Sequence, residues 1–154
     1  MVGGAAASWP TRAWTQPAPA MLRVGTANVQ PRSAPHWVAF MQRMAALGYI
    51  EGKNFTYDHV QILNTQVWEP TYREVVVRKP DIVIAAGPEL SLKSALATSG
   101  DLPVVMIAVD YDPIARGYIK SLSRPAEHIT GVYFQSNRVG GQAAATVEGG
   151  LSRL

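Results

Sequence analysis

Two acidic side chains, Asp110 and Asp112, flank Tyr111 directly after an apolar segment of the sequence. That segment, Pro103–Val109, has the length and composition of a buried strand. A carboxylate at the end of such a strand can bind an ammonium group, and a tyrosine ring beside it can stack on a ligand. Asp110, Tyr111 and Asp112 are therefore candidate ligand-binding residues.

An enzymatic interpretation of the same residues is open. An apolar strand followed by Asp-x-Asp resembles the nucleophile motif of haloacid-dehalogenase-type phosphatases, in which one carboxylate attacks and both help to hold Mg²⁺. That motif belongs on a first strand, with a Lys and an acidic pair well downstream, whereas Asp110 and Asp112 lie late in this chain. A structural alternative for Asp112 is to cap a helix that begins at Pro113.

A second candidate site follows the apolar run Asp81–Ala86, where Gly87 permits a sharp turn and Pro88 suits the first turn of a helix. Open α/β sheets bind ligands at such places, outside the carboxyl ends of the strands. Backbone N–H groups there can hold a carboxylate or phosphate, although Glu89 already opposes the helix dipole. We expect Ala86, Gly87, Pro88 and Glu89 to contact a solute, with an ordinary strand-to-helix turn as the alternative.

Few other side chains suggest a role in ligand binding, metal binding or catalysis. Gln30 follows the first expected strand and either faces the same edge or lies in solvent. His36, His59 and His128 are too far apart in the sequence to suggest a metal site, and the chain has no cysteine. No P-loop, Gly-x-Gly-x-x-Gly or Gly-x-Ser-x-Gly motif is present. We therefore expect no cofactor and no catalytic residue.

Composition indicates a globular domain. The 154 residues are 47% hydrophobic and 16% charged, with a formal net charge of +3. The cations are scattered, and Arg78-Lys79 is their one adjacent pair, which does not favour nucleic acid as a partner. The sequence has no window of 18 apolar residues that could span a membrane.

Apolar spacing predicts alternating strands and helices after Met21. The expected strands are 21–29, 54–62, 81–86, 103–109 and 129–134. The expected helices are one capped by Ser33 and ended by Gly48, with Trp37 in the core, and then 70–79, 89–99, 113–122 and 139–151. This alternation predicts an α/β fold, a Rossmann-like and mostly parallel five-stranded sheet with helices on both faces. We expect strand order 2-1-3-4-5, with a switch point between the first and third strands.

The first twenty residues admit two interpretations. Val2–Trp9 suits the apolar region of a secretory signal, and Ala18-Pro19-Ala20 suits its cleavage site, although a basic start is missing and Pro10 interrupts the run. The favoured interpretation of residues 1–20 is thus a signal-peptide remnant. The alternative is a disordered extension.

Several motifs, taken together, resemble a known family. They are Leu47-Gly48-Tyr49-Ile50-Glu51-Gly52-Lys53-Asn54, Ala85-Ala86-Gly87, Asp112-Pro113 with Gly117, Ser121-Leu122, Arg124-Pro125 and Ile129-Thr130-Gly131. In this order and spacing they resemble bacterial substrate-binding proteins of ABC transporters, of the tryptophan/tyrosine type. The resemblance covers residues 21–137, and Gly3–Pro10 is similar to the signal-peptide tail of such proteins. The chain departs from the family pattern at Ala126-Glu127-His128 and after Asn137.

The resemblance implies a type I periplasmic-binding fold, in which two Rossmann-like lobes close on a small solute. Residues 21–137 would form the N-terminal lobe, and 138–154 a helix or tail at a truncated crossover to a missing second lobe. The implied function is non-catalytic: a periplasmic, exported component of an ABC import system, which binds an amino-acid-like solute and delivers it to a permease. We expect weak or no binding by one lobe alone and homo-oligomers through its exposed face. The alternative function is the Mg-dependent Asp-x-Asp phosphatase.

Overall fold

The computed structural model describes residues 21–63, 67–121, 128–137 and 144–147. Its strands are β1 (Leu22–Asn28), β2 (Phe55–Gln61), β3 (Ile82–Gly87), β4 (Val104–Val109), β5 (Ile129–Asn137) and β6 (Ala144–Val147). Its helices are α1 (Pro35–Ala46), α2 (Trp68–Val77) and α3 (Glu89–Ser99). The expected signal-peptide remnant, residues 1–20, lies outside this description.

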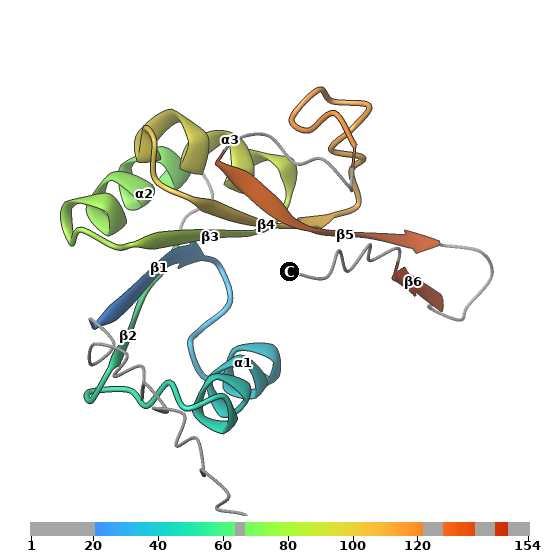
Figure 1. The fold of residues 1–154 in the computed structure, drawn as a ribbon. Helices are drawn as coiled ribbons and strands as arrows, with labels where there is room; N and C mark the ends of the chain where they lie inside the picture. The colour runs from blue at the N-terminus through green and yellow to red at the C-terminus, as the bar shows by residue number, and fades with distance from the viewer. Residues whose placement is uncertain (1–20, 64–66, 122–127, 138–143, 148–154) are drawn as a thin grey trace, which may run out of the picture.

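The described strands form one sheet in the order β2-β1-β3-β4-β5-β6 (Figure 1). Strands β1 to β5 run parallel, and β6 runs antiparallel to β5 at the edge. The predicted order of the first five strands and the predicted α/β fold are therefore confirmed. The switch point lies between β1 and β3, where the chain order along the sheet reverses.

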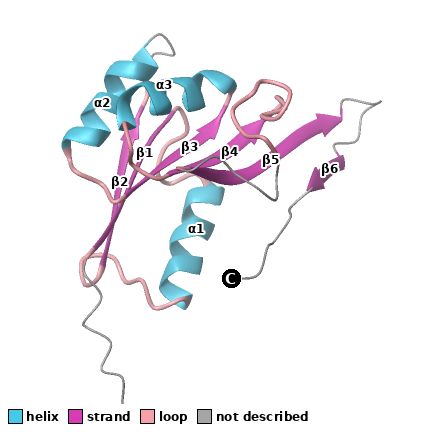
Figure 2. Ribbon diagram, turned by 45° about the horizontal axis from the view of Figure 1, so that its top comes forward, coloured by secondary structure: helices cyan, strands magenta, loops and turns pink. Residues whose placement is uncertain are grey.

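The helices cover the two faces of the sheet unequally. Helices α2 and α3 lie together on one face, and α1 lies on the other, beside β1 and β2 (Figures 1 and 2). The larger core lies under α2 and α3 and includes Tyr72, Leu92 and Met106, each fully buried. The smaller core lies under α1 and is built around Trp37 and Phe55. Among the described residues, no helix covers the α1 side of β4 and β5.

Helix boundaries differ from the prediction at two helices. The N-cap position of helix α1 is Ala34 and not Ser33, and no side chain caps the helix there. Pro35 takes the first helical position, which its fixed φ suits. Helix α2 begins at Trp68, two residues before the predicted start. It ends at Val77, because Pro80 disfavours a helical conformation for the residue before it, and Lys79 turns to a φ of 54°.

The helix predicted over 113–122 is wrong in its described part. The chain forms a single turn there, in which the N–H of Tyr118 donates to the carbonyl of Pro113 at 2.9 Å. Gly117 has a φ of 77°, which ends the turn before a helix can propagate.

The helix predicted over 139–151 is wrong at 144–147, which form β6. Glycine pairs precede and follow this segment at 140–141 and 149–150, and they weaken a helix. Thr146 and Val147 are β-branched and favour a strand. The rest of 138–154 lies outside the described residues.

Candidate functional site

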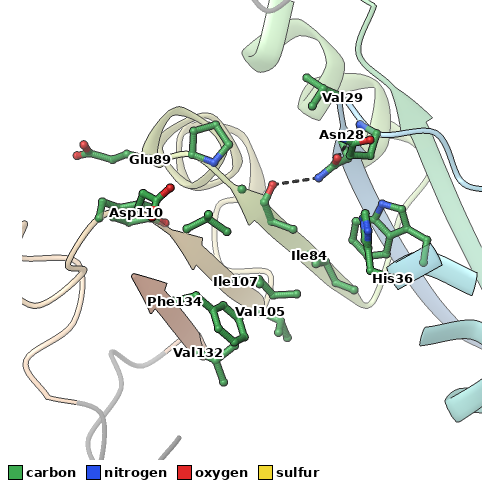
Figure 3. A pocket seen from close by; sticks show the side chains of 18 of the residues that line it. Asn28, Val29, His36, Ile84, Glu89, Val105, Ile107, Asp110, Val132 and Phe134 are labelled. Carbon is green, nitrogen blue, oxygen red and sulfur yellow. Dashed lines mark hydrogen bonds between the residues drawn. The ribbon is translucent and has the colours of Figure 1, made fainter. Parts of the chain in front are cut away.

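A cleft of about 1090 Å³ opens at the carboxyl ends of β1, β3 and β4 and continues along the α1 side of β3, β4 and β5 (Figure 3). Its lining comes from β1, β3, β4 and β5, from the loops after β1, β3 and β4, from α1, and from the first residues of α2 and α3. The lining residues are Asn28, Val29, Gln30, His36, Trp37, Phe40, Trp68, Ile84, Ala86, Gly87, Pro88, Glu89, Val105, Ile107, Val109, Asp110, Tyr111, Arg116, Gly131, Val132 and Phe134.

The structure brings most of the sequence-predicted residues to this cleft. Its lining includes Gln30, Ala86, Gly87, Pro88, Glu89, Asp110 and Tyr111. Asp112 does not line it. The Asp112 Oδ1 atom instead accepts the backbone N–H groups of Ile114 and Ala115, at 2.8 and 3.1 Å. Asp112 therefore caps the turn that follows, which was the structural alternative for it.

Glu89 is engaged by three side chains of the protein. The Tyr118 hydroxyl donates to Glu89 Oε1 at 2.8 Å, and Lys93 and Arg116 lie within ion-pair distance, at 3.4 and 3.6 Å. The hydrogen bond from Tyr118, with the two cations, lowers the pKa of Glu89. Glu89 thus joins the start of α3 to the turn after β4 and is not positioned as a free acid for a solute.

The start of α3 remains open to the cleft. Its N-cap is Pro88, which has no side chain that can accept the first N–H groups of the helix. Gly87, with a φ of 114°, turns the chain sharply from β3 into this cap. Backbone N–H groups of this first turn can donate to an anion in the cleft, although the Glu89 carboxylate already offsets part of the helix dipole.

Asp110 and Tyr111 form the part of the cleft that follows β4. Asp110 has a left-handed backbone with a φ of 61°, which is uncommon outside glycine, and its N–H donates to the carbonyl of Phe134 at 2.8 Å. The Tyr111 ring packs edge-on against Tyr118, with ring centroids 6.4 Å apart. Burial raises the pKa of Tyr111, so its hydroxyl stays protonated. No partner for that buried hydroxyl lies within the described residues.

Sequence reasoning missed Asn28. The residue is 5% exposed, and its Nδ2 donates to the carbonyl of Ala86 at 3.0 Å, the dashed line in Figure 3. Its Oδ1 accepts the N–H of Gln30 at 2.8 Å. The signal that could have revealed it is a polar amide at the carboxyl end of an otherwise apolar first strand, next to the switch point.

Trp37 was expected in the core, and it is 3% exposed, yet its ring also forms one wall of the cleft. It contacts Tyr57 and His59, with ring centroids 5.7 Å away in each case. Burial lowers the pKa of His59, which favours its neutral form. This aromatic cluster makes the wall rigid and apolar.

The floor of the cleft is the sheet face beside α1 that no described helix covers. Figure 3 shows side chains of β3, β4 and β5 on the same side of the sheet as His36; they are Ile84, Val105, Ile107, Val132 and Phe134. The cleft thus combines a polar rim, made by loops, with a long apolar floor. Such a surface can bind an amphipathic molecule without any covalent chemistry.

The arrangement does not assemble the paired carboxylates of the phosphatase hypothesis. Asp110 lines the cleft, whereas Asp112 is used as a cap. Across the parts of the chain that the structure describes, no group of three or more His, Cys, Asp or Glu side chains could hold a metal ion. The described helices are also too short or too polar to cross a membrane.

Comparison with known proteins identifies one family. A family model described as ABC transporter substrate binding protein matches residues 38–143. A comparison with curated proteins finds no significant match.

Solved structures with the same fold include three bacterial proteins. A conserved domain protein from Vibrio cholerae is 24% identical, with a TM-score of 0.63 over 76% of this chain and 40% of that one. An ABC domain from Streptococcus pneumoniae in complex with L-Trp is 20% identical, with a TM-score of 0.61 over 73% and 38%. The ligand-free, open form of a substrate binding protein with adhesive properties from Clostridium difficile is 22% identical, with a TM-score of 0.60 over 70% and 37%.

At these identities the likeness shows a shared fold. The chain spans between 37% and 40% of the length of these three proteins.

Proposed function

The chain belongs to the ABC transporter substrate-binding protein family, and from this premise we propose that it captures a small amino-acid-like solute at the carboxyl ends of its strands. The main support for the proposal is that the loops after β1, β3 and β4 converge on one cleft. Open α/β sheets bind ligands in this position. The proposed role is non-catalytic and needs no cofactor.

The chemistry of the cleft favours an amino acid with an apolar side chain. The first turn of α3 suits a carboxylate through its backbone N–H groups, and the Arg116 guanidinium on the lining, which already lies 3.6 Å from Glu89, can add a contact. Asp110 suits an ammonium group, and the Tyr111 hydroxyl, which has no partner among the described residues, can serve as a further polar contact. The apolar floor suits an aromatic or aliphatic side chain. The complex of the Streptococcus protein with L-Trp makes tryptophan the first solute to test.

The proposed mechanism uses two lobes. Residues 21–137 form the lobe on which the solute docks, and 138–154 lead toward a second lobe that closes over it. The share of the neighbours' length that this chain covers agrees with one lobe of two. One wall of a cleft buries about half of a small ligand, so the 154 residues alone bind weakly.

The family also suggests where the protein works and with what. Substrate-binding proteins of ABC transporters are typically exported, so we place this protein in the periplasm, with residues 1–20 as the remnant of its export signal. Its partner would be an ABC permease, to which it delivers the solute. Because no described helix covers the apolar sheet face beside α1, we propose that copies of the isolated chain associate with one another through it.

Isothermal titration calorimetry of the 154-residue protein tests the proposal. L-tryptophan and L-leucine are titrated into the wild type and into Asp110→Asn, which keeps the size of the side chain and removes its charge. We expect weak binding, with a Kd well above about 1 µM, and further loss in the variant. A Kd below about 1 µM would contradict the one-lobe argument. No heat with either amino acid at millimolar concentration would contradict the proposed solute class.

A further inference from the structure

The ladder between strands β1 and β3 ends before the carboxyl ends of the two strands. Their ladder covers Val24, Gly25 and Thr26 of β1 against Ile82 to Ile84 of β3. The ladder between β1 and β2 continues to Asn28, and the ladder between β3 and β4 continues to Gly87. The last residues of β1 and β3 therefore lie beyond their common ladder, at the switch point of the sheet.

Buried side chains bridge β1 and β3 here. The Thr26 hydroxyl donates to the carbonyl of Ile84 at 2.8 Å, and Asn28 Nδ2 donates to the carbonyl of Ala86 at 3.0 Å. The Tyr72 hydroxyl lies 3.3 Å from the carbonyl oxygens of both Ala27 and Ile84. Thr26 and Tyr72 are 0% exposed, and Asn28 is 5% exposed. The side chains thus supply hydrogen bonds between β1 and β3 where their ladder ends.

Asn28 differs from the other bridging residues because its two hydrogen bonds reach both the end of β3 and the loop after β1. Its Nδ2 reaches the end of β3, and its Oδ1 accepts the N–H of Gln30 in the loop after β1. Both of these places line the cleft. One rigid amide therefore connects two of the loops on which the proposed function depends.

We propose that Asn28 is a positioning residue, which sets the spacing between the loop after β1 and the loop after β3 so that both can contact one solute. This inference rests on the proposed function. Asparagine suits the position because its amide carries a donor and an acceptor on one planar group. Aspartate keeps the acceptor for Gln30 but turns an oxygen toward the Ala86 carbonyl. Alanine loses both hydrogen bonds.

Thr26→Val is the matched control. It removes a hydrogen bond of the same buried bridge, one that also joins β1 to β3, and it keeps the shape of the side chain. Thr26 does not line the cleft. A purely structural role for Asn28 predicts that Asn28 and Thr26 variants behave alike, apart from stability. A positioning role predicts that Asn28 variants alter the loops after β1 and β3, whereas Thr26 variants do not.

The first experiment measures amide hydrogen exchange by NMR on the 154-residue protein. We expect Asn28→Ala to speed exchange of the Gln30 amide at least about tenfold, and Thr26→Val to leave it unchanged relative to global stability. We expect Asn28→Asp to keep Gln30 protected but to shift the backbone resonances of Ala86 and Gly87. Equal exchange of Gln30 in all four proteins would overturn the proposal.

Two further measurements test the positioning role of Asn28 if some of the variants fold poorly. In the wild type, one Nδ2 proton of Asn28 should exchange slowly; rapid exchange of both would count against the bridge. Calorimetry with L-tryptophan should then show an affinity loss of about tenfold for Asn28→Asp beyond that of Thr26→Val, and equal losses would overturn the positioning role. If the wild type binds no tryptophan, the proposed solute fails, and hydrogen exchange still decides the role of Asn28.

Discussion

Asp110 combines an unfavourable backbone conformation with a place in the cleft. A left-handed conformation costs an ordinary residue about 1–2 kcal/mol, and aspartate tolerates it better than most. The hydrogen bond from its N–H to the carbonyl of Phe134 holds the conformation. Strained residues of this kind cluster at ligand sites, where the surrounding structure holds them in place. The conformation therefore supports a functional role for this residue.

We predict that Asp110→Gly is more stable than Asp110→Ala by about 1 kcal/mol, because glycine adopts the left-handed conformation without steric penalty. Both variants should weaken binding of tryptophan. Urea unfolding measures the stabilities. The same two substitutions at Gln42, an exposed position in α1, serve as the control, and there alanine should be the more stable by about 1 kcal/mol. If the glycine and alanine variants rank in the same order of stability at both positions, the backbone of Asp110 is not strained.

Glu89 links stability to pH. Its pKa is lowered in the folded protein, first by the hydrogen bond from Tyr118 and then by Arg116 and Lys93. A lowered pKa means that the folded state binds the proton less readily than the unfolded state. The stabilisation is thus present above the ordinary value of 4.5 and is lost as the pH falls through the folded pKa.

Glu89→Gln should therefore lower the melting temperature at neutral pH, and the difference from wild type should shrink as the pH falls below about 4.5. Melting curves by circular dichroism at several pH values check this. Glu74→Gln is the control, since it removes an exposed ion pair with Arg78, away from the cleft. A difference for Glu89→Gln that stays constant down to pH 3 would exclude this linkage.

At the scale of the elements, α2 packs close to β1 because Gly25 has no side chain. A Cβ atom at Gly25 would lie 2.5 Å from Val75 Cγ1 and 3.3 Å from Pro80 Cβ. Val75 is fully buried, so it has little room to yield. This contact fixes the distance between α2 and the sheet, and with it the position of Tyr72 in the bridge between β1 and β3.

Gly25→Ala should lower the free energy of unfolding by about 1–3 kcal/mol, because it overpacks the interface. Val75→Ala should also destabilise, by leaving a cavity. The double variant should lose less than the sum of the two, since each change makes room for the other. Urea unfolding of the four proteins checks the coupling. The control pairs Gly25→Ala with Val104→Ala, on β4, and there the two losses of unfolding free energy should add. If the losses add for both pairs, the tight contact between position 25 and Val75 is disproved.

The sequence predicted those strands and helices that a short, continuous run of residues specifies. The apolar run 81–86 and the glycine after it predicted β3 and the turn into α3, and both are present. The loop residues of the cleft could be predicted because they directly follow strands. The roles of Asn28 and Phe134 could not, because they depend on which strands pair and which sheet face the helices leave open. The helix predicted over 113–122 was wrong in its described part because Asp112 caps a single turn as well as it caps a helix.

For the whole molecule, the most consequential feature is the apolar sheet face beside α1. Parallel sheets are normally covered on both faces, because their strands are apolar on both sides. Here Val105, Ile107 and Phe134 remain partly exposed. Water contact with this face is unfavourable, and a second copy of the chain can remove it through a two-fold interface.

We predict that the wild-type chain self-associates as its concentration rises and that Phe134→Glu shifts it toward monomer, because a buried carboxylate at the interface is unfavourable. Sedimentation velocity over a concentration series measures this. Val77→Glu is the control, since Val77 is 78% exposed at the end of α2, on the opposite face. A wild type that stays monomeric at every concentration would contradict the prediction.

The bridge between β1 and β3 cannot form during synthesis until the ribosome has made β3. Thr26 and Asn28 bind carbonyl groups that lie 58 residues later in the chain. At about 5–20 residues per second, a ribosome needs roughly 3–12 seconds to make the intervening 58 residues. Once β2 (Phe55–Gln61) has been made within that interval, β1 can pair with it, but the other edge of β1 stays unpaired. The nascent chain thus presents an open strand edge beside the future cleft until β3 emerges, a period in which other chains or chaperones can reach it.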